Sequence, residues 1–335
     1  MEITFRLKTD HWLYITFTIL AFFSCSSGAV CSKIFDSADS EEMFDPWIKG
    51  GVLSYLFTTA DDKIKNDLQI LFNNLDLNSE EQNKLKELGL YEAKFIYEIK
   101  KKDYEWRDKN KGSSNNKKEI HSTNINKKLV DFQSEIDESV EDILEDKYAK
   151  FRKWTRNWWK KEIQFRGKKR KVLMQIGPAL EITCYVFATQ FDLPSVAVAL
   201  PDKYIKFANL NWPILDYYGD WYQNSSYYVT VIRDEYILDA PVMDVGPWNE
   251  DDNYWNYAEW FSEGFPPYRR MFDELSLCMP EARAAFEKNY NNGLDQFGRQ
   301  VLNAAGIDLT FEAAEKLGLG FLENAWVTVV FDNFY

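Results

Sequence analysis

The stretch that decides the fold is Ala240-Pro-Val-Met-Asp-Val-Gly-Pro-Trp-Asn249, which directly follows the mainly apolar residues Tyr236-Ile-Leu-Asp239. An apolar run that ends at a Gly-Pro break is typical of a β-strand followed by a tight turn. Asp244 stands just before that break. A carboxylate at the end of a buried strand costs free energy unless it is hydrogen-bonded or used in chemistry. The stretch therefore predicts a strand that ends at a candidate functional acid.

A second informative stretch runs from 305 to 319, Ala-Gly-Ile-Asp-Leu-Thr-Phe-Glu-Ala-Ala-Glu-Lys-Leu-Gly-Leu, and the strand-like run 326–331 follows it. Thr310 is suited to N-cap a short helix over 311–317, and Gly318 is suited to end it. We expect Asp308, just before this helix, to be structural and to tie the helix entry to the neighbouring strands.

Taken in order, the Asp-x-Gly-Pro turn, the Ile-Asp-Leu-Thr stretch and the closing strand resemble the double-psi β-barrel of the rare lipoprotein A and expansin-like group. The resemblance covers the C-terminal half. It implies an α+β fold, with a helical module before a six-stranded double-psi β-barrel. In lytic transglycosylases of the group the Asp of Asp-x-Gly-Pro is a catalytic acid. The resemblance thus implies that Asp244 is a general acid and that Gly246 and Pro247 form the structural turn.

The chain departs from those enzymes at a second position. They also use a His at the end of an earlier strand, and this chain has only His11 and His121. The matching region, 196–203, contains no His. Related wall-enzyme barrels carry an Asp there, which makes Asp202 the candidate second carboxylate. The missing His raises the alternative of a barrel that binds without catalysing.

Aromatic, acidic and amide residues alternate between Trp248 and Trp260. Aromatic faces next to carboxylates and amides suit sugars, because the ring stacks on C–H groups while polar groups bind hydroxyls. The alternative is a structured loop whose aromatic side chains pack on the barrel. Arg299, close to these motifs, could pair with Asp308 or with an acid of the substrate. The predicted substrate-binding residues are Trp248, Asn249, Tyr254, Trp255 and Arg299.

Composition limits the classes of protein that fit. The chain has 335 residues, 45% hydrophobic and 16% aromatic, which is enough for a packed core and for two domains. A net charge of −13 argues against a general nucleic-acid binder, because phosphate binding needs a basic surface. No C-x-x-C pair is present, and the acids at 250–252 match no calcium loop. We therefore predict no metal and no cofactor.

The N-terminus indicates export. Arg6 and Lys8 precede the apolar run 12–23, which is too short for a membrane span and suits a signal peptide. Small residues allow cleavage after 29, and the alternative is a lipoprotein signal to about Cys25. We predict a secreted or periplasmic, cell-envelope protein that meets a membrane only through a lipid anchor on Cys25. Export allows a Cys184–Cys278 disulfide, and two buried free thiols are the alternative.

The remaining sequence predicts a helical module over 43–166 and a barrel domain over 167–335. A Ser-x-x-Gln capping box is expected from Ser79 to Gln82, and a polar loop over 109–118. A helical-hairpin core is expected from an apolar stripe with spacings of three and four. The stripe consists of Leu129, Phe132, Ile136, Val140 and Ile143.

Segment 150–171 is strongly basic and carries Trp154, Trp158 and Trp159. Such a helix could lie on an anionic envelope surface, and the alternative is a linker helix whose tryptophans dock on the barrel.

The leading hypothesis is a protein that acts on peptidoglycan or another polysaccharide, similar to a lytic transglycosylase with Asp244 as acid. The alternatives are a non-catalytic carbohydrate-binding barrel and an envelope interaction protein that uses 150–171.

Overall fold

The computed structural model describes residues 47, 50–110, 112–169, 173–176, 180–201, 228–255 and 271–331. All of these residues belong to one compact unit, 44–335. The predicted signal at 1–29, Cys25 and Asp202 lie outside the described residues. None of the described helices combines the length and apolar character that a membrane span requires.

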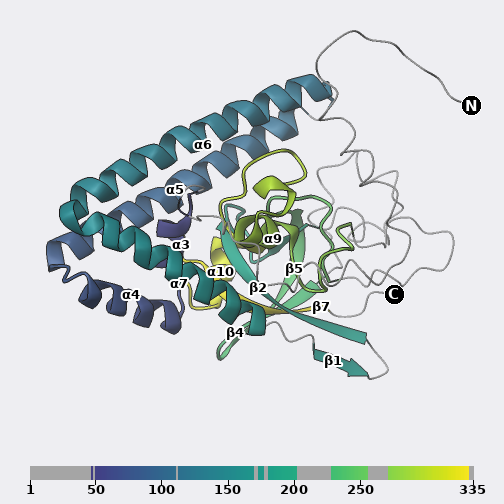
Figure 1. The fold of residues 1–335 in the computed structure, drawn as a ribbon. Coiled ribbons are helices and arrows are strands. Elements are labelled where there is room, and N and C mark those ends of the chain that lie inside the picture. Colours follow the sequence, from purple (N-terminus) through teal and green to yellow (C-terminus); the bar gives the residue numbers. More distant parts are fainter. Residues whose placement is uncertain are drawn as a thin grey trace, which may run out of the picture. The chain divides into compact units, whose positions relative to one another are not determined.

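The first half of the described chain is helical, as predicted. It comprises α3 (Val52–Thr58), α4 (Asp62–Asn74), α5 (Ser79–Lys109), α6 (Asn115–Leu144), the 3-10 turn η2 (Glu145–Lys147) and α7 (Tyr148–Lys169). Figure 1 shows α5 and α6 side by side as a long hairpin. The turn between them is shorter than the predicted loop, because Ser114 already caps α6.

Asn78 caps the start of α5. Its side chain accepts hydrogen bonds from the amides of Glu80 and Glu81, and the Glu81 carboxylate accepts one from the Asn78 amide at 2.7 Å. These reciprocal bonds form a capping box. The prediction of a box from Ser79 to Gln82 was wrong by one residue. Asn is as good an N-cap as Ser, and a Glu at the third helical position supplies the returning acceptor.

An apolar stripe on α6 forms the hairpin core. Leu129, Phe132, Ile136 and Val140 are all buried, as their spacing predicts. Phe95 of α5 stacks on Phe132 with ring centroids 3.6 Å apart. The stripe faces the other helices because side chains three and four residues apart share one face of a helix.

The described residues of the second half form seven strands and three short helical segments. The strands are β1 (Leu173–Ile176), β2 (Leu180–Phe191), β3 (Val198–Leu200), β4 (Tyr228–Arg233), β5 (Tyr236–Val245), β6 (Ala305–Thr310) and β7 (Ala325–Phe331). The helical segments are α9 (Glu281–Lys288), η6 (Tyr290–Gly293) and α10 (Phe311–Lys316).

Six of the strands close into a barrel in the order β2-β6-β3-β5-β4-β7, and β7 pairs back with β2. The pairs β2–β6 and β3–β5 are parallel and the others antiparallel, while β1 pairs with β2 outside the ring. The predicted α+β class, with helices before a six-stranded barrel, is confirmed. Closure removes exposed strand edges.

Alternate strand residues fill the barrel interior. Val186, Val198, Leu200, Ile307 and Val329 are among the fully buried members of this core. Six strands leave no room for a ligand between packed side chains, so a binding site must lie on the outer wall or at the rim. At one end, Thr310 N-caps α10 by accepting a hydrogen bond from the Ala313 amide, and Gly318 follows the helix with φ +69°. Both features were predicted.

A disulfide joins Cys184 of β2 to Cys278, just before α9. This bond decides between the two alternatives left open by the sequence. Structural disulfides form and persist mainly in oxidising compartments, so the bond supports the prediction of export without testing the signal itself.

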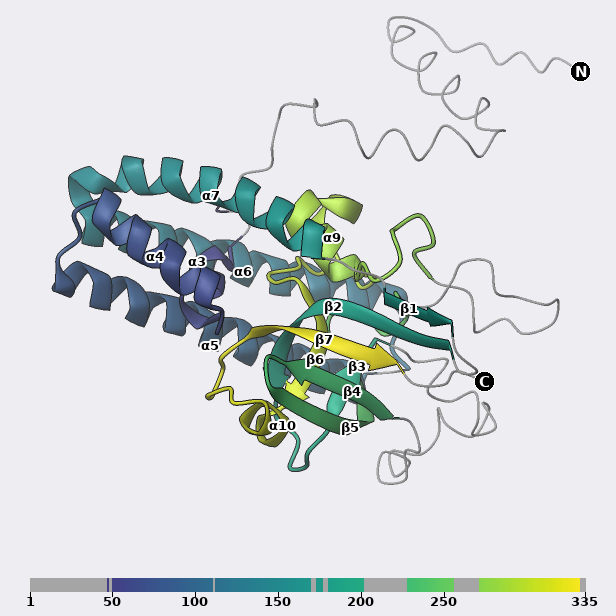
Figure 2. The ribbon, with the colours of Figure 1, turned by 90° about the horizontal axis from the view of Figure 1, so that it is seen from below.

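Helix α7 turns its tryptophans inward. Trp158 and Trp159 are 5% and 2% exposed, and Trp159 packs edge-on against Phe286 of α9. Figure 2 shows the C-terminal end of α7 beside α9. Lys153 and Lys160, on the opposite face, are exposed. Trp158 and Trp159 therefore pack inside the protein, as the linker-helix alternative predicts. If α7 binds an anionic surface, only its exposed basic face can make the contact.

Arg166, near the end of α7, joins the helices to the barrel. It is fully buried, its Nε pairs with Glu162, and its Nη1 donates to Asp61 at 2.8 Å and to the Tyr185 hydroxyl at 2.9 Å. Tyr185 belongs to β2, so one guanidinium links α4, α7 and the barrel wall. The predicted domain boundary near 166–167 falls inside α7.

Candidate functional site

Asp244 lies on the outer wall of the barrel near the end of β5. Val242 pairs with Val198 of β3 and Asp244 with Ala199, so the register shifts by one residue at Met243. Such a bulge changes the face of the sheet to which the side chains after it point. The half-buried Asp244 accepts hydrogen bonds at Oδ1 from the Val245 amide, at 2.7 Å, and from the Tyr104 hydroxyl, at 3.4 Å.

The turn after Asp244 requires glycine. Gly246 has φ +155°, which L-residues rarely adopt, and its amide donates to the Leu200 carbonyl at 3.1 Å. The Gly246–Pro247 peptide bond is cis. These features hold the end of β5 against the end of β3 and thereby place Asp244.

Asp308 lies in the same row of the barrel wall as Asp244. It pairs with Ala199 on one side and with Thr189 of β2 on the other, and the Thr189 hydroxyl donates to Asp308 Oδ1. Paired residues of neighbouring strands point to the same face of a sheet. The row Thr189, Asp308, Ala199 and Asp244 thus crosses four strands on the outside of the barrel.

Helix α5 lies along this row and adds two polar side chains. Lys100 Nζ is 3.3 Å from Asp308 Oδ2, and Tyr104, one turn later, contacts Asp244. Asp308 therefore joins β6 to β2 and α5. Its described contacts tie β6 to its neighbours, while Thr310 caps α10.

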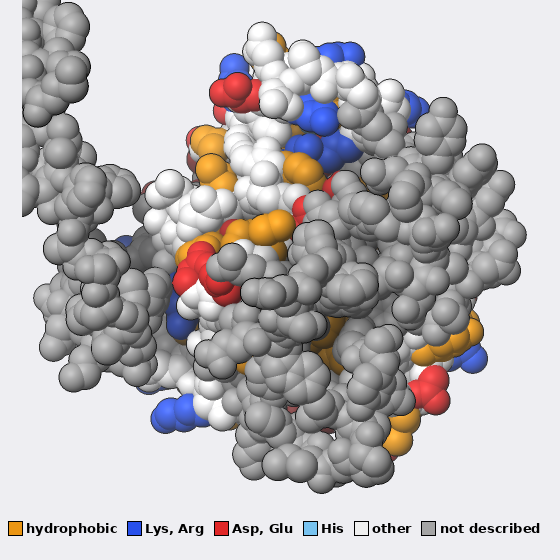
Figure 3. Space-filling view, turned by 90° about the vertical axis from the view of Figure 1, so that its right-hand side faces the viewer, with side chains coloured by type: hydrophobic (Ala, Val, Ile, Leu, Met, Phe, Trp, Pro, Cys, Tyr) orange, Lys and Arg blue, Asp and Glu red, His pale blue; other side chains and the backbone are white. Residues whose placement is uncertain are grey.

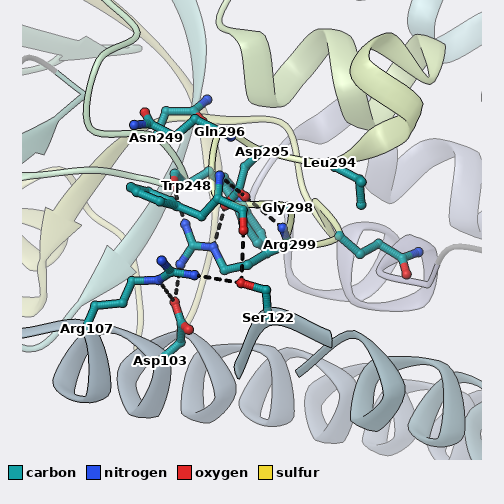
Figure 4. A network of polar contacts seen from close by, with 12 residues as sticks. Asp103, Arg107, Ser122, Trp248, Asn249, Leu294, Asp295, Gln296, Gly298 and Arg299 are labelled. Carbon is teal, nitrogen blue, oxygen red and sulfur yellow. Dashed lines mark hydrogen bonds and ion pairs between the residues drawn. The ribbon is translucent and has the colours of Figure 1, made fainter. Parts of the chain in front are cut away.

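A buried polar network holds α5 at the barrel (Figure 4). Arg299 pairs with Asp295 on its own loop and with Asp103 of α5, and it donates to the Trp248 carbonyl. Arg107 also pairs with Asp103, at 2.8 Å. Burial by itself would raise the pKa of Asp103, but Arg299 and Arg107 outweigh it and hold that pKa below its ordinary value.

Arg299 does not pair with Asp308, contrary to one predicted role. Its charge is satisfied by Asp295 and Asp103, and its guanidinium lies 5.8 Å from the centre of the Trp248 ring. Trp248 is 7% exposed, and its indole N–H donates to Asn303 at 2.8 Å. Asn249 is 1% exposed and donates to Glu281. In this structure these three predicted binding residues make internal contacts.

Tyr254 and Trp255 are fully buried in the barrel core. Trp255 stacks on Phe331 with ring centroids 4.5 Å apart, and the Tyr254 hydroxyl donates to the Gly306 carbonyl at 2.9 Å. A sugar cannot stack on rings enclosed in this way, so the prediction that they bind substrate is corrected. The packing alternative is the one that the structure shows for both residues.

Glu281 is a buried acid that the sequence analysis did not single out. Its Oε2 accepts from the Asn249 amide group at 2.8 Å, and Oε1 has no hydrogen-bond partner among the described residues. Burial, with a further contribution from the Asp295 charge, raises the pKa of Glu281 to about 7. The sequence offered no signal for it, because an acid in the first turn of a helix is ordinarily a surface residue.

No described histidine lies beside Asp244. His121 stacks on Trp106 with ring centroids 3.7 Å apart and contacts Asp103 at 2.8 Å. Over the described ranges, no three His, Cys, Asp or Glu side chains are grouped to hold a metal ion.

The row of acids continues into an aromatic cluster that sequence reasoning missed. Phe311 lies between Tyr97 of α5 and Phe321, with ring centroids 6.0 Å and 5.0 Å apart respectively. Phe321 is 68% exposed, and Tyr97 and Phe311 are partly exposed. Tyr97, Lys101 and Tyr104 follow one another along α5 at helical spacing, and Lys101 pairs with Asp192 of the β2–β3 connection at 3.0 Å.

We call this strip the α5–barrel seam. It consists of Tyr97, Lys100, Lys101, Tyr104, Asp192, Asp244, Asp308, Phe311 and Phe321. The spacing of residues 97, 101 and 104 places them on one face of a helix, but no local sequence feature indicated that this face of α5 would meet the barrel. On the face shown in Figure 3, by comparison, basic, acidic and hydrophobic side chains are interspersed over the described part.

A small recess opens at the seam between α3, α5 and the barrel. Its volume is about 40 Å³, and its lining includes Ala93, Tyr97, Lys100, Gln190 and Leu322. A neighbouring recess of about 10 Å³ lies between α5, α6 and Trp248. Asp244 lines neither recess.

Comparison with known proteins adds one finding. A family profile described as "Domain of unknown function (DUF8814)" matches residues 187–330, which is less than half of the chain. The matched segment runs from β2 to β7 and leaves out α3 to α7. No curated protein and no solved structure matches the chain.

Proposed function

We propose that this protein is an exported, non-catalytic polysaccharide-binding protein of the cell envelope, with peptidoglycan as the principal candidate ligand. Its barrel would be a double-psi barrel similar to that of the rare lipoprotein A and expansin-like group. Three features support this assignment: a closed mixed barrel of six strands, an Asp-x-Gly-Pro turn at the end of β5, and a disulfide suited to an oxidising compartment.

The observation that carries the proposal is the composition of the α5–barrel seam. Three touching aromatic rings, with Phe321 68% exposed, adjoin a strip of carboxylates, lysines and a phenol. Sugars bind such surfaces by stacking their C–H faces on rings and by hydrogen-bonding their hydroxyls to charged or amide groups. An extended glycan would lie along the seam from Phe321 towards Asp244.

Binding is better supported than cleavage. A general acid must protonate the leaving oxygen in an open cleft, usually opposite a second group. Asp244 lines neither of the two recesses described above, and Tyr104 and the Val245 amide both contact its Oδ1. We therefore propose that Asp244 positions sugar hydroxyls and does not transfer a proton.

Co-sedimentation with purified peptidoglycan tests the proposal. We expect the wild-type chain to pellet with the wall and Phe321→Ser to bind about tenfold more weakly, because a ring that stacks on sugar is lost. Ile237→Ser is the matched control, since Ile237 is equally exposed at 68% but lies on the β4–β5 hairpin.

Two results would overturn the proposal. Equal weakening by both substitutions would mean that the seam is not the binding surface. Release of anhydro-muropeptides by the wild type, lost in Asp244→Asn, would replace binding by lytic transglycosylase activity.

A further inference from the structure

The recess at the seam has a chemistry that fits one small group. Its lining combines apolar side chains, including Ala93, Ile96 and Phe187, with hydroxyl groups, Lys100 and three side-chain amides, Gln190, Asn303 and Asn324. A volume of about 40 Å³ holds on the order of three water-sized groups. The recess therefore has room for a small pendant substituent.

Gln190 makes hydrogen bonds through both its Nε2 and its Oε1, whereas Asn303 and Asn324 are each half satisfied. Asn303 Oδ1 accepts from the Trp248 indole at 2.8 Å and from the Ala305 amide, and among the described residues nothing accepts from its Nδ2. Asn324 Nδ2 donates to the Thr58 hydroxyl at 2.9 Å, and nothing described donates to its Oδ1. The recess thus offers one donor group and one acceptor that no described residue uses, on two side chains that are only partly buried.

A secondary amide with a methyl end complements this lining. Its C=O can accept from Asn303, its N–H can donate to Asn324, and its methyl can lie against Ala93, Ile96 and Phe187. Tyr97, at the edge of the same recess, would stack on the ring that carries the group.

We propose that this recess binds the acetamido group of an N-acetylated amino sugar, so that helix α5 and the barrel half together set the sugar specificity. The inference rests on the proposed function, because it names the substituent that the seam would recognise. Ala93, Ile96 and Tyr97 of α5 would contact the methyl group and the sugar ring, whereas Asn303 and Asn324 of the barrel half would make the two hydrogen bonds.

Binding of two matched trisaccharides tests the inference. The β-1,4-linked trimer of N-acetylglucosamine and cellotriose share a backbone and differ in acetamido against hydroxyl. We expect the full-length protein to bind the acetylated trimer roughly tenfold to a hundredfold more tightly, because one buried methyl and two hydrogen bonds distinguish them. In saturation-transfer NMR, the acetyl methyl protons should receive the strongest saturation.

Ala93→Leu, which fills the recess, should abolish the preference between the two sugars. Lys94→Leu is the matched control, because Lys94 is the next residue of α5 and is exposed. Asn324→Ala, which removes the free acceptor, should reduce the preference if Ala93→Leu fails to fold. The ratio of the two affinities is read out because a changed folded fraction does not alter it.

The outcomes separate the two proposals. Equal binding of both trimers to a protein that still pellets with the wall overturns the inference and leaves the proposed function standing. No binding to any glycan overturns both. An acetyl preference that survives Ala93→Leu and Asn324→Ala, or binding of an acetylated peptide with equal strength, overturns the assignment of this recess.

Discussion

At the residue scale, two buried carboxyl groups, those of Asp103 and Glu281, have pKa values shifted in opposite directions. Asp103 is buried among arginines, and its pKa is lowered in spite of burial. Glu281 is buried beside neutral Asn249 and near Asp295, and its pKa is raised to about 7. Charge partners favour ionisation and desolvation opposes it, so the neighbours decide which effect prevails.

Glu281→Gln should reduce the pH dependence of stability. Since the folded pKa of about 7 lies above the ordinary 4.5, the unfolded chain releases its proton first, and the free energy of unfolding falls as pH rises through that window. Above about pH 7, ionisation of Glu281 therefore lowers the free energy of unfolding of the wild type by about 3 kcal/mol. Gln carries no charge, so the variant should gain about that much over the wild type between about pH 5 and about pH 8.

Urea unfolding at both pH values measures this difference, with Glu315→Gln on the exposed face of α10 as the control. A constant difference between Glu281→Gln and the wild type across the range would show that Glu281 is ionised at low pH in the folded protein.

At the scale of elements, α5 is the helix on which the candidate site depends. One side contributes Tyr97, Lys100 and Tyr104 to the seam, and Asp103 between them holds the helix to the Trp248 loop through Arg299. Because Asp103 lies within one turn of both Lys100 and Tyr104, the position of the seam residues depends on this buried ion pair.

Asp103→Ala should destabilise the protein by about 3 kcal/mol, because it leaves Arg299 and Arg107 buried without a shared partner. It should also weaken binding to peptidoglycan under conditions where the variant is fully folded, since α5 would lose its anchor. Denaturant unfolding measures the first effect and co-sedimentation the second. Glu105→Ala, on the exposed face of the same helix, should change neither, and a loss of stability as small as in this control would contradict the role of Asp103.

At the scale of the whole molecule, long-range links join the described helices and strands into one unit. Arg166 links α7 and α4 to β2, and the Trp326 indole of β7 donates to the Tyr55 hydroxyl of α3 at 2.9 Å. The Cys184–Cys278 disulfide closes a further loop across a sequence separation of 94 residues. Residues far apart in the chain thereby constrain one another.

Removing that disulfide should lower the free energy of unfolding by about 4 kcal/mol, because a cross-link over 94 residues removes much of the entropy of the unfolded chain. We expect Cys184→Ala with Cys278→Ala to lower the midpoint of denaturant unfolding, and dithiothreitol to lower that of the wild type similarly. Dithiothreitol should leave the double variant unchanged, which serves as the control. A wild-type midpoint that is insensitive to reduction would show that the two thiols are free in solution.

Local sequence determined much of the fold. The six-stranded barrel was expected from the resemblance to a known barrel group, whereas the α6 stripe, the Thr310 cap and the strand before Gly246 could be predicted because side-chain periodicity and turn chemistry act over a few residues. The same reasoning placed Asp244 at a strand end. It also proposed the Cys184–Cys278 pair but left it undecided, since a bond over that distance depends on how β2 and the chain before α9 are brought together.

The role of each aromatic and charged residue was decided only by the tertiary structure. Tyr254 and Trp255 look like a sugar platform in the sequence, yet they fill the barrel core. Tyr97 and Phe321 look unremarkable in the sequence, yet they form the exposed cluster. An aromatic side chain gains free energy in either setting, and which one it occupies depends on contacts between elements more than two hundred residues apart, such as Tyr97 with Phe311. Such contacts form only when α5 packs along the barrel wall, and no local pattern in the chain encodes that packing.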